Sequence, residues 1–163
     1  MLFRSLWAPL IDHVSVPFLT RALGRRRSWL LVSQLVIIVG LVNMALTDPK
    51  TALTPLVWGA LLVAFASATQ DIALDAFRIE SADVQHQAAM AATYQTGYRL
   101  AMIWAGAGVL WLAARTELTT TNGYQHVGWQ TAYLVMALSM LVGVVTVVLS
   151  KEPVAKKVRP AQS

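Results

Sequence analysis

Long apolar runs alternate with short charged segments along the chain. Four runs are long enough for a helix to cross about 30 Å of hydrocarbon, which takes roughly 20 residues. They cover residues 28–47, 51–77, 88–114 and 129–150. The second run contains two acidic residues toward its end and the third a single arginine, whereas the first and fourth are uncharged. The pattern predicts an all-α, polytopic membrane helix bundle.

The two ends of the chain are shorter or more polar. Residues 1–11 would rise only about 16 Å as a helix, so they predict half of a span. Residues 151–163 are basic and contain Pro153 and Pro160, which predicts a cytoplasmic tail or linker. We therefore expect one partial helix bundle over residues 1–150, followed by this tail.

Composition agrees with a membrane protein. Hydrophobic residues make up 56% of the chain and charged residues 13%, against about 25% charged in soluble domains. Cysteine is absent, which excludes disulfides and thiolate metal sites. The net charge of +5 does not indicate nucleic-acid binding, because the basic residues flank apolar runs instead of gathering on one polar face.

The distribution of lysine and arginine predicts the orientation, since cytoplasmic loops retain these residues. With alternating spans, nine of them fall on one side and two, Lys50 and Arg115, on the other. The nine are Arg21, Arg25, Arg26, Arg27, Arg78, Lys151, Lys156, Lys157 and Arg159. The loop at residues 24–27, the loop at 78–87 and the tail should therefore be cytoplasmic.

Charged residues in the second run follow helical spacing. Asp71, Asp75 and Arg78 lie along one stripe of a helix, which should face protein or water, not lipid. One interpretation is an ion-pair cluster of Asp75, Arg78 and Glu80 at the cytoplasmic end. Asp71 lies one turn deeper, where withdrawal from water favours the protonated carboxyl, so we expect a role in taking up and releasing a proton.

Arg99 lies about 18 Å into the third run, near the membrane midplane. An arginine at this depth needs a partner, which we expect to be Asp71 or an anionic group of a substrate. A buried structural ion pair is the alternative. Tyr94, Gln95 and Tyr98 lie within about a turn and can hydrogen-bond a polar ligand, although tyrosines near a helix entrance also serve as interface anchors.

The segment Gly24–Arg27 follows Asp12 after a short loop and resembles a cytoplasmic gate motif. Its arginines can pair with Asp75 or Glu80 on an adjacent helix end. Alternatively, three arginines beside a span do no more than fix the topology. The small residues 105–108 are expected to let a neighbouring helix approach closely.

Chemistry of other kinds has little support in the sequence. The three histidines are far apart and have no i,i+4 ligand spacing, so no metal is predicted. We find no convincing nucleophile, phosphate loop or nucleic-acid module. The sequence therefore predicts neither an enzyme nor a bound cofactor.

Several segments together resemble a known family, the AmpG-type muropeptide permeases of the major facilitator superfamily. They are Leu6–Asp12, Gly24–Leu31, Ser67–Glu80, Gly97–Arg99, Gly128–Trp129 and Glu152–Pro153. The resemblance implies part of the N-terminal half of that fold, from the end of helix 2 through helix 6. It also implies proton-coupled import of anhydro-muropeptides across the bacterial inner membrane for peptidoglycan recycling.

The resemblance assigns roles to individual residues. Ala68, Gln70 and Asp71 would line the substrate or proton pathway. Asp12, Gly24, Arg25 and Arg26 would belong to the cytoplasmic gate. The partners it implies are the lipid bilayer, a polar cargo and protons, together with the missing half or another permease chain.

Two other functions remain open from the sequence. A major facilitator transporter of another polar solute, such as acetyl-coenzyme A, keeps the fold and changes the cargo. A small membrane protein that associates with a full-length permease, without transporting anything, is the alternative of a different class. We expect that the chain alone does not catalyse uptake, because alternating access requires two halves.

Overall fold

All regular structure in the described part of the chain is helical, which confirms the predicted fold class. The computed structural model describes residues 19–81, 85–117 and 126–151. Its elements in chain order are α2 (Leu19–Leu23), α3 (Arg25–Leu46), α4 (Leu53–Ser81), α5 (Gln87–Ile103), the π-helix η1 (Trp104–Gly108), α6 (Val109–Glu117) and α7 (His126–Leu149). The expected half-span at residues 1–11 and the tail beyond residue 151 lie outside these ranges.

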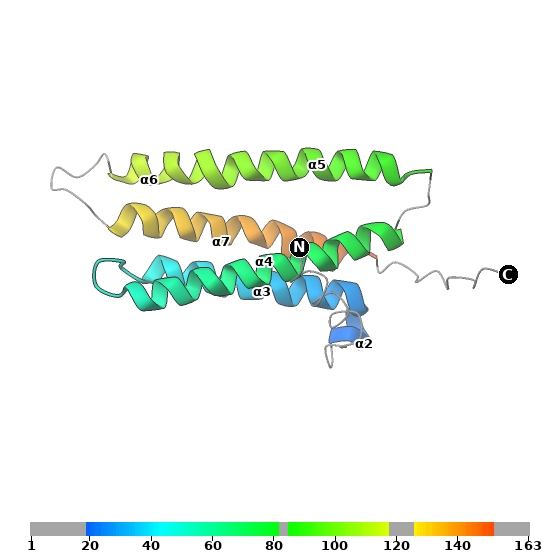
Figure 1. The fold of residues 1–163 in the computed structure, drawn as a ribbon, viewed down its shortest axis with the longest axis horizontal. Helices are drawn as coiled ribbons and strands as arrows, with labels where there is room; N and C mark the ends of the chain where they lie inside the picture. Colours follow the sequence, from blue (N-terminus) through cyan, green and yellow to red (C-terminus); the bar gives the residue numbers. More distant parts are fainter. Residues whose placement is uncertain (1–18, 82–84, 118–125, 152–163) are drawn as a thin grey trace.

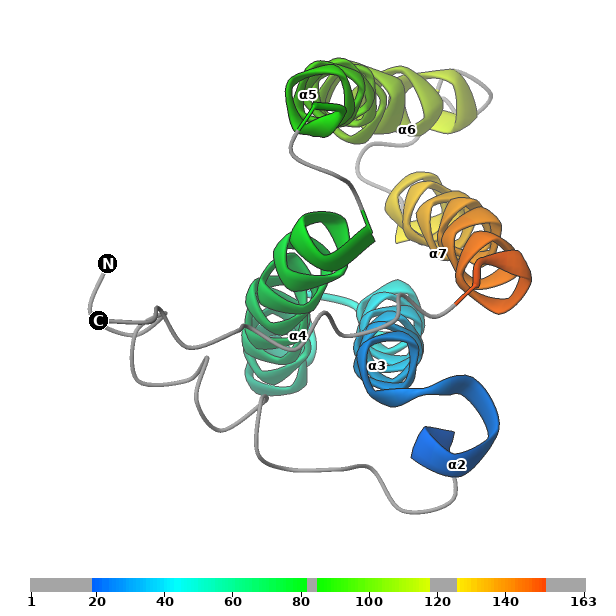
Figure 2. The same cartoon turned by 90° about the vertical axis from the view of Figure 1, so that its right-hand side faces the viewer.

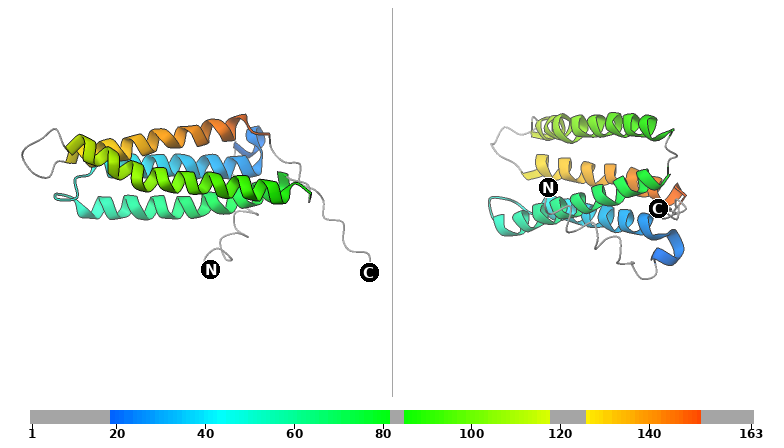
Figure 3. Two further views of the ribbon diagram at one scale, coloured as in Figure 1. Left: turned by 90° about the horizontal axis from the view of Figure 1, so that it is seen from above. Right: turned by 45° about the vertical axis from the view of Figure 1, so that its right-hand side comes forward.

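Four helical units are long and apolar enough to cross a membrane: α3, α4, the continuous unit α5–η1–α6, and α7. Each overlaps one of the four predicted spans, and the axes of all four lie roughly along the same line (Figures 1 and 3). The helix α4 continues past the predicted end at Phe77 to Ser81. Its 29 residues correspond to about 43 Å, so its charged end extends beyond the hydrocarbon core.

The ends of the helices form two opposite groups (Figure 1). The end of α3, the start of α4, the end of α6 and the start of α7 lie at one end of the bundle, called here the outer end. The starts of α3 and α5 and the ends of α4 and α7 lie at the other, the inner end. This is the alternating arrangement that the lysine and arginine distribution requires.

The helix α3 packs between α4 and α7 (Figure 2). Leu30 and Leu31 of α3 form a buried cluster with Ala73 of α4 and Val147 of α7. Toward the outer end, a Cβ on Gly59 of α4 would lie only 2.9 Å from the Asn43 Oδ1 atom of α3. A larger residue there would have to displace this side chain, because the two helices approach closely.

The unit α5–η1–α6 lies at the edge of the bundle (Figure 2). No residue of α5 or η1 is buried, and the main packing of the unit is that of α6 against α7. In η1, Trp104 Nε1 donates a hydrogen bond to Ser139 Oγ at 3.2 Å.

The small residues 105–108 do not receive a neighbouring helix as predicted. A Cβ on Gly106 would meet nothing within 4 Å, whereas one on Gly108 would lie 2.6 Å from the Trp104 ring. The glycine therefore makes room for an indole of its own span. Regular 3.6-residue spacing predicted an uninterrupted helix here and gave no sign of the π turn.

Candidate functional site

A polar pocket lies between α4 and α5. It has a volume of about 260 Å³ and is lined by Asp71, Asp75, Tyr94, Gln95 and Tyr98. The two carboxylates are four residues apart on α4, and the two tyrosines are four apart on α5, so each pair shares one helix face. The pocket thus joins the predicted acidic stripe to the predicted polar group on the next span.

Aromatic and charged groups meet at one edge of this pocket. The Tyr94 and Tyr98 rings stack with centroids 6.4 Å apart and planes inclined by 27°. The Arg78 guanidinium lies 5.1 Å from the Tyr94 ring centroid and 3.6 Å from Asp75 Oδ1. Asp75 and Arg78 are thus paired, as one interpretation of the sequence predicted, and Arg78 also connects α4 to α5.

Arg99 is not part of this pocket. Its side chain is exposed, no ion pair in the described ranges joins it to Asp71, and it is not among the lining residues. The predicted contact between the two is therefore absent. Helical spacing alone places Arg99 on the same stripe as the lining residue Gln95, four residues earlier, so nothing in the sequence indicated that Arg99 lies outside the pocket.

Two pathway residues implied by the resemblance are likewise absent from the described lining of the pocket. Gln70 and Ala68 are half-buried and do not line it. Gln70 lies on the side of α4 that carries the buried residues Ala66 and Ala73, and its Oε1 atom is buried without a hydrogen-bond donor. Whether Gln70 contacts a solute stays a prediction.

An ion pair joins α3 to α4 at the inner end. Arg26 donates to Glu80 Oε1 from Nε at 3.1 Å and from Nη2 at 2.6 Å. The Arg26 side chain is 8% exposed and that of Glu80 25%. The predicted pairing of this arginine cluster with an adjacent helix end is therefore confirmed for Glu80.

The other residues of the predicted gate have different surroundings. Gly24 has a φ of 88°, a conformation that favours glycine, and this turn separates α2 from α3. Its carbonyl accepts a hydrogen bond from Ser28 Oγ at 2.5 Å. Arg25 is exposed. Asp12 lies outside the residues that the structure describes.

Arg27 makes a contact that the sequence did not predict. This buried side chain donates from Nε to the Val147 carbonyl at 2.9 Å and from Nη2 to the Val148 carbonyl at 2.6 Å. Both carbonyls belong to the last turn of α7, where they have no partner within the helix. Arginines 26 and 27 thus join the start of α3 to the inner ends of both neighbouring helices.

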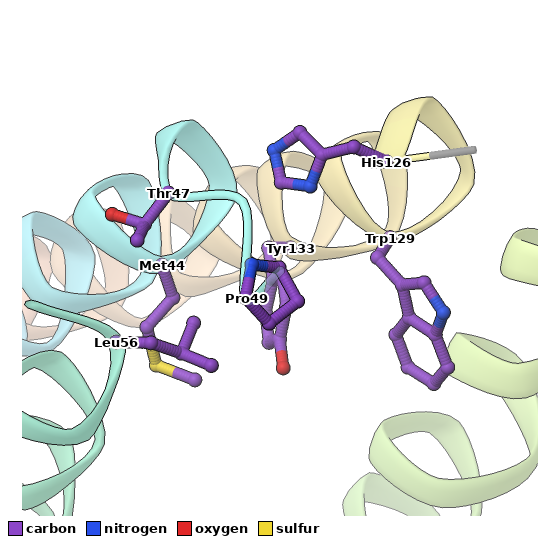
Figure 4. Close-up of a pocket in the computed structure, with 7 residues that line it drawn as sticks. All are labelled: Met44, Thr47, Pro49, Leu56, His126, Trp129 and Tyr133. Atoms are coloured by element: carbon purple, nitrogen blue, oxygen red, sulfur yellow. The ribbon is translucent and has the colours of Figure 1, made fainter. Parts of the chain in front are cut away.

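A second pocket, of about 220 Å³, lies at the outer end (Figure 4). Its lining comes from α3, α4, α7 and the turn between α3 and α4. The lining residues are Met44, Thr47, Pro49, Leu56, His126, Trp129 and Tyr133. His126 connects α7 to α3 through its Nε2 atom, which lies 2.9 Å from the Ala45 carbonyl oxygen. No spacing in the sequence pointed to this contact, because the two residues are far apart along the chain.

Comparisons with known proteins agree with the predicted resemblance. The Major Facilitator Superfamily matches residues 1–163. The "Putative transporter AmpG 4" of Rickettsia felis is 36% identical over 157 residues, which are 95% of this chain and 36% of that protein. The anhydromuropeptide permease of Escherichia coli K12 is 35% identical over 151 residues, 93% of this chain and 28% of the permease.

An uncharacterized protein of Haemophilus influenzae is 41% identical over 152 residues, 92% of this chain and 32% of that protein. The chain thus spans about a third of the length of the curated relatives it matches. No solved structure matches it significantly. From the match along its whole length and its four membrane-competent helices, the chain belongs to the Major Facilitator Superfamily of multi-pass membrane proteins, where it is similar to the AmpG-type transporters.

Proposed function

We propose that this chain forms part of a proton-coupled transporter that imports anhydro-muropeptides across the bacterial inner membrane for peptidoglycan recycling. The observation that carries the proposal is the carboxylate-lined pocket between α4 and α5. Charged groups within a span are costly and mark solute or proton pathways. The cargo is suggested by the similarity to a protein named as an anhydromuropeptide permease.

In this proposal the residues of the pocket have different roles. Asp71 takes up and releases the coupled proton, while Tyr94, Gln95 and Tyr98 hydrogen-bond the polar cargo. At the inner end, the Arg26–Glu80 pair holds α3 against α4 and closes the cytoplasmic mouth until the helices move apart. Asp75 and Arg78 lie between these two regions and connect them.

Uptake of labelled anhydro-muropeptide tests the proposal in cells that lack their own permease. Because the chain spans about a third of its relatives, the transporting form is a chimera in which it replaces the matching residues of the E. coli permease. We expect Asp71→Asn to reduce uptake at least about tenfold, the scale at which loss of a proton carrier acts. The matched control is Asp48→Asn, in the turn between α3 and α4.

Different outcomes overturn different parts of the proposal. Uptake by the Asp71→Asn chimera equal to that of its parent removes Asp71 from the mechanism. Uptake that persists in a protonophore excludes proton coupling. The chain expressed alone is expected not to accumulate cargo, and protonophore-sensitive uptake by it would refute the requirement for a second half.

A second candidate function is association with another permease chain without transport. The observation that favours it is α5, which has no buried residue although it carries several polar side chains. A polar helix surface in a membrane is expected to contact protein or water. Co-purification of the chain with a full-length permease, without any effect of Asp71→Asn on uptake, would support this candidate over the first.

A further inference from the structure

Hydrogen-bond acceptors dominate the pocket between α4 and α5. Among the described residues, its lining includes two carboxylates and no lysine or arginine, and Arg78 lies at its edge. An ionised carboxylate only accepts hydrogen bonds and has about four lone-pair sites, so one that already has a partner still accepts from a ligand. The hydroxyls of Tyr94 and Tyr98 and the amide of Gln95 can act as donors or acceptors. The lining therefore suits a group that donates several hydrogen bonds.

The protein itself provides an example of how a cation is held here. The Arg78 guanidinium is positioned between the Asp75 carboxylate, at 3.6 Å, and the face of the Tyr94 ring, at 5.1 Å from its centroid. The negative face of an aromatic ring attracts a cation, and a nearby carboxylate adds to this attraction. At this edge of the pocket the combination of carboxylate and ring is thus a cation site.

The same combination recurs one turn away. Asp71 precedes Asp75 by one turn of α4, and Tyr98 follows Tyr94 by one turn of α5. The two helices run in opposite directions (Figure 1), so Asp71 and Tyr98 reach the same level. Both line the pocket, and the Tyr98 ring stacks 6.4 Å from that of Tyr94. A solute in the pocket therefore lies near the Asp71 carboxylate and the Tyr98 ring, the same combination of groups that holds Arg78.

We infer that the proposed transport site binds an ammonium group of its solute between the Asp71 carboxylate and the face of the Tyr98 ring. The inference rests on the proposed function and specifies the chemical class of the cargo. An ammonium group donates three hydrogen bonds and carries a compact positive charge. A solute rich in phosphate, such as acetyl-coenzyme A, offers acceptors and negative charge, which this lining does not complement.

Calorimetric binding to the transporting chimera, purified in lipid nanodiscs, tests the inference. One probe is a synthetic anhydro-muropeptide with one free amine on its peptide, and the second is the same compound acetylated at that amine. We expect acetylation to weaken binding about tenfold, the effect of one lost charge-assisted contact over a ring. Acetyl-coenzyme A, as a third probe, should bind more weakly than either.

Variants locate the contact within the pocket. Asp71→Asn and Tyr98→Leu should bring the affinity ratio of the two muropeptides close to one. Tyr98→Phe keeps the ring face and should retain the preference, and Asp48→Asn in the outer turn should match the parent. Helical content measured by circular dichroism identifies any variant that fails to fold. If Tyr98→Leu fails to fold, Tyr98→Phe still tests the role of the ring.

The outcomes separate this inference from the proposed function. Equal binding of the two muropeptides to the parent chimera would overturn the ammonium inference and leave muropeptide transport standing. A preference that persists in Asp71→Asn would also overturn it. Absence of binding by both muropeptides would reject the proposed cargo, and the inference with it.

Discussion

Arg26 and Arg27 are adjacent in sequence yet contact different helices. Successive residues on a helix point about 100° apart, so Arg26 reaches Glu80 of α4 while Arg27 reaches the last carbonyls of α7. Three helices are thereby held together at the inner end by neighbouring side chains. Substitutions at the two positions should have separable effects.

Arg27→Met should destabilise the protein because it leaves the Val147 and Val148 carbonyls without their buried donor. The expected loss is about 2–3 kcal/mol in the free energy of unfolding, from the cost of unpaired buried polar groups. Unfolding in detergent, followed by circular dichroism, measures it. An exposed basic residue just after α7 gives the control, since Lys151→Met should change stability by less than about 0.5 kcal/mol.

The Arg26–Glu80 pair should show a measurable coupling energy. A double-mutant cycle with Arg26→Gln and Glu80→Gln is expected to give about 1–2 kcal/mol, because Arg26 is buried and donates two hydrogen bonds, at 3.1 and 2.6 Å, to one oxygen of Glu80. The same cycle for Asp75 and Arg78, 3.6 Å apart and more exposed, should give less than about 0.5 kcal/mol. Equal couplings would mean that burial does not strengthen the inner pair.

Side-chain contacts were predictable where charge left few choices of partner. The arginine cluster and the end of the second span supplied opposite charges at the same membrane level. The structure contains the Arg26–Glu80 pair that these charges predicted. Depth alone was insufficient for Arg99, because depth does not specify the direction in which a side chain points. Contacts to backbone carbonyls, such as those of Arg27 and His126, leave no mark in the sequence.

At the scale of elements, the close contact of α3 with α4 depends on glycine. Gly59→Val should destabilise the protein by about 1–3 kcal/mol through overpacking, because its Cβ would lie 2.9 Å from the Asn43 and Met44 side chains. Gly97→Val is the matched control in α5, where a Cβ would meet nothing within 4 Å. The same unfolding measurement tests both, and equal destabilisation would contradict this account of the α3–α4 packing.

The positions of the helices were predictable from apolar run lengths, but their ends and irregularities were not. The extension of α4 beyond Phe77 depends on charged residues that continue the helix into the aqueous region. The π turn at η1 follows from how Trp104 packs over Gly108, a contact between residues of one span that a hydropathy pattern does not record.

For the whole molecule, the nine-to-two distribution of lysine and arginine predicts a cytoplasmic inner end. The chain has no cysteine, so single-cysteine variants need no background removal. In intact cells, an impermeant maleimide should label Thr51→Cys at the outer end and not Ser81→Cys at the inner end. Both sites are exposed. The reverse labelling pattern would show that the orientation is inverted.

The predicted architecture agrees with the structure because long hydrophobic runs identify membrane-spanning helices directly. In a soluble protein, run length identifies the elements less directly. The location of the pocket was predictable in part, since the sequence indicated an acidic stripe on the second span and a group of polar residues on the third, but not which faces of the two helices meet. The cargo was not, because one fold serves many functions.

The most direct test of the transport pathway is protection of an engineered cysteine by cargo. Gln95→Cys lines the pocket, whereas Thr96→Cys is one residue along α5 and does not. Both variants are made in the transporting chimera and treated with a water-soluble maleimide, with and without anhydro-muropeptide. A pathway through the pocket predicts that cargo slows labelling of Gln95→Cys and leaves Thr96→Cys unchanged. No protection at Gln95→Cys, in a chimera that takes up muropeptide, would contradict it.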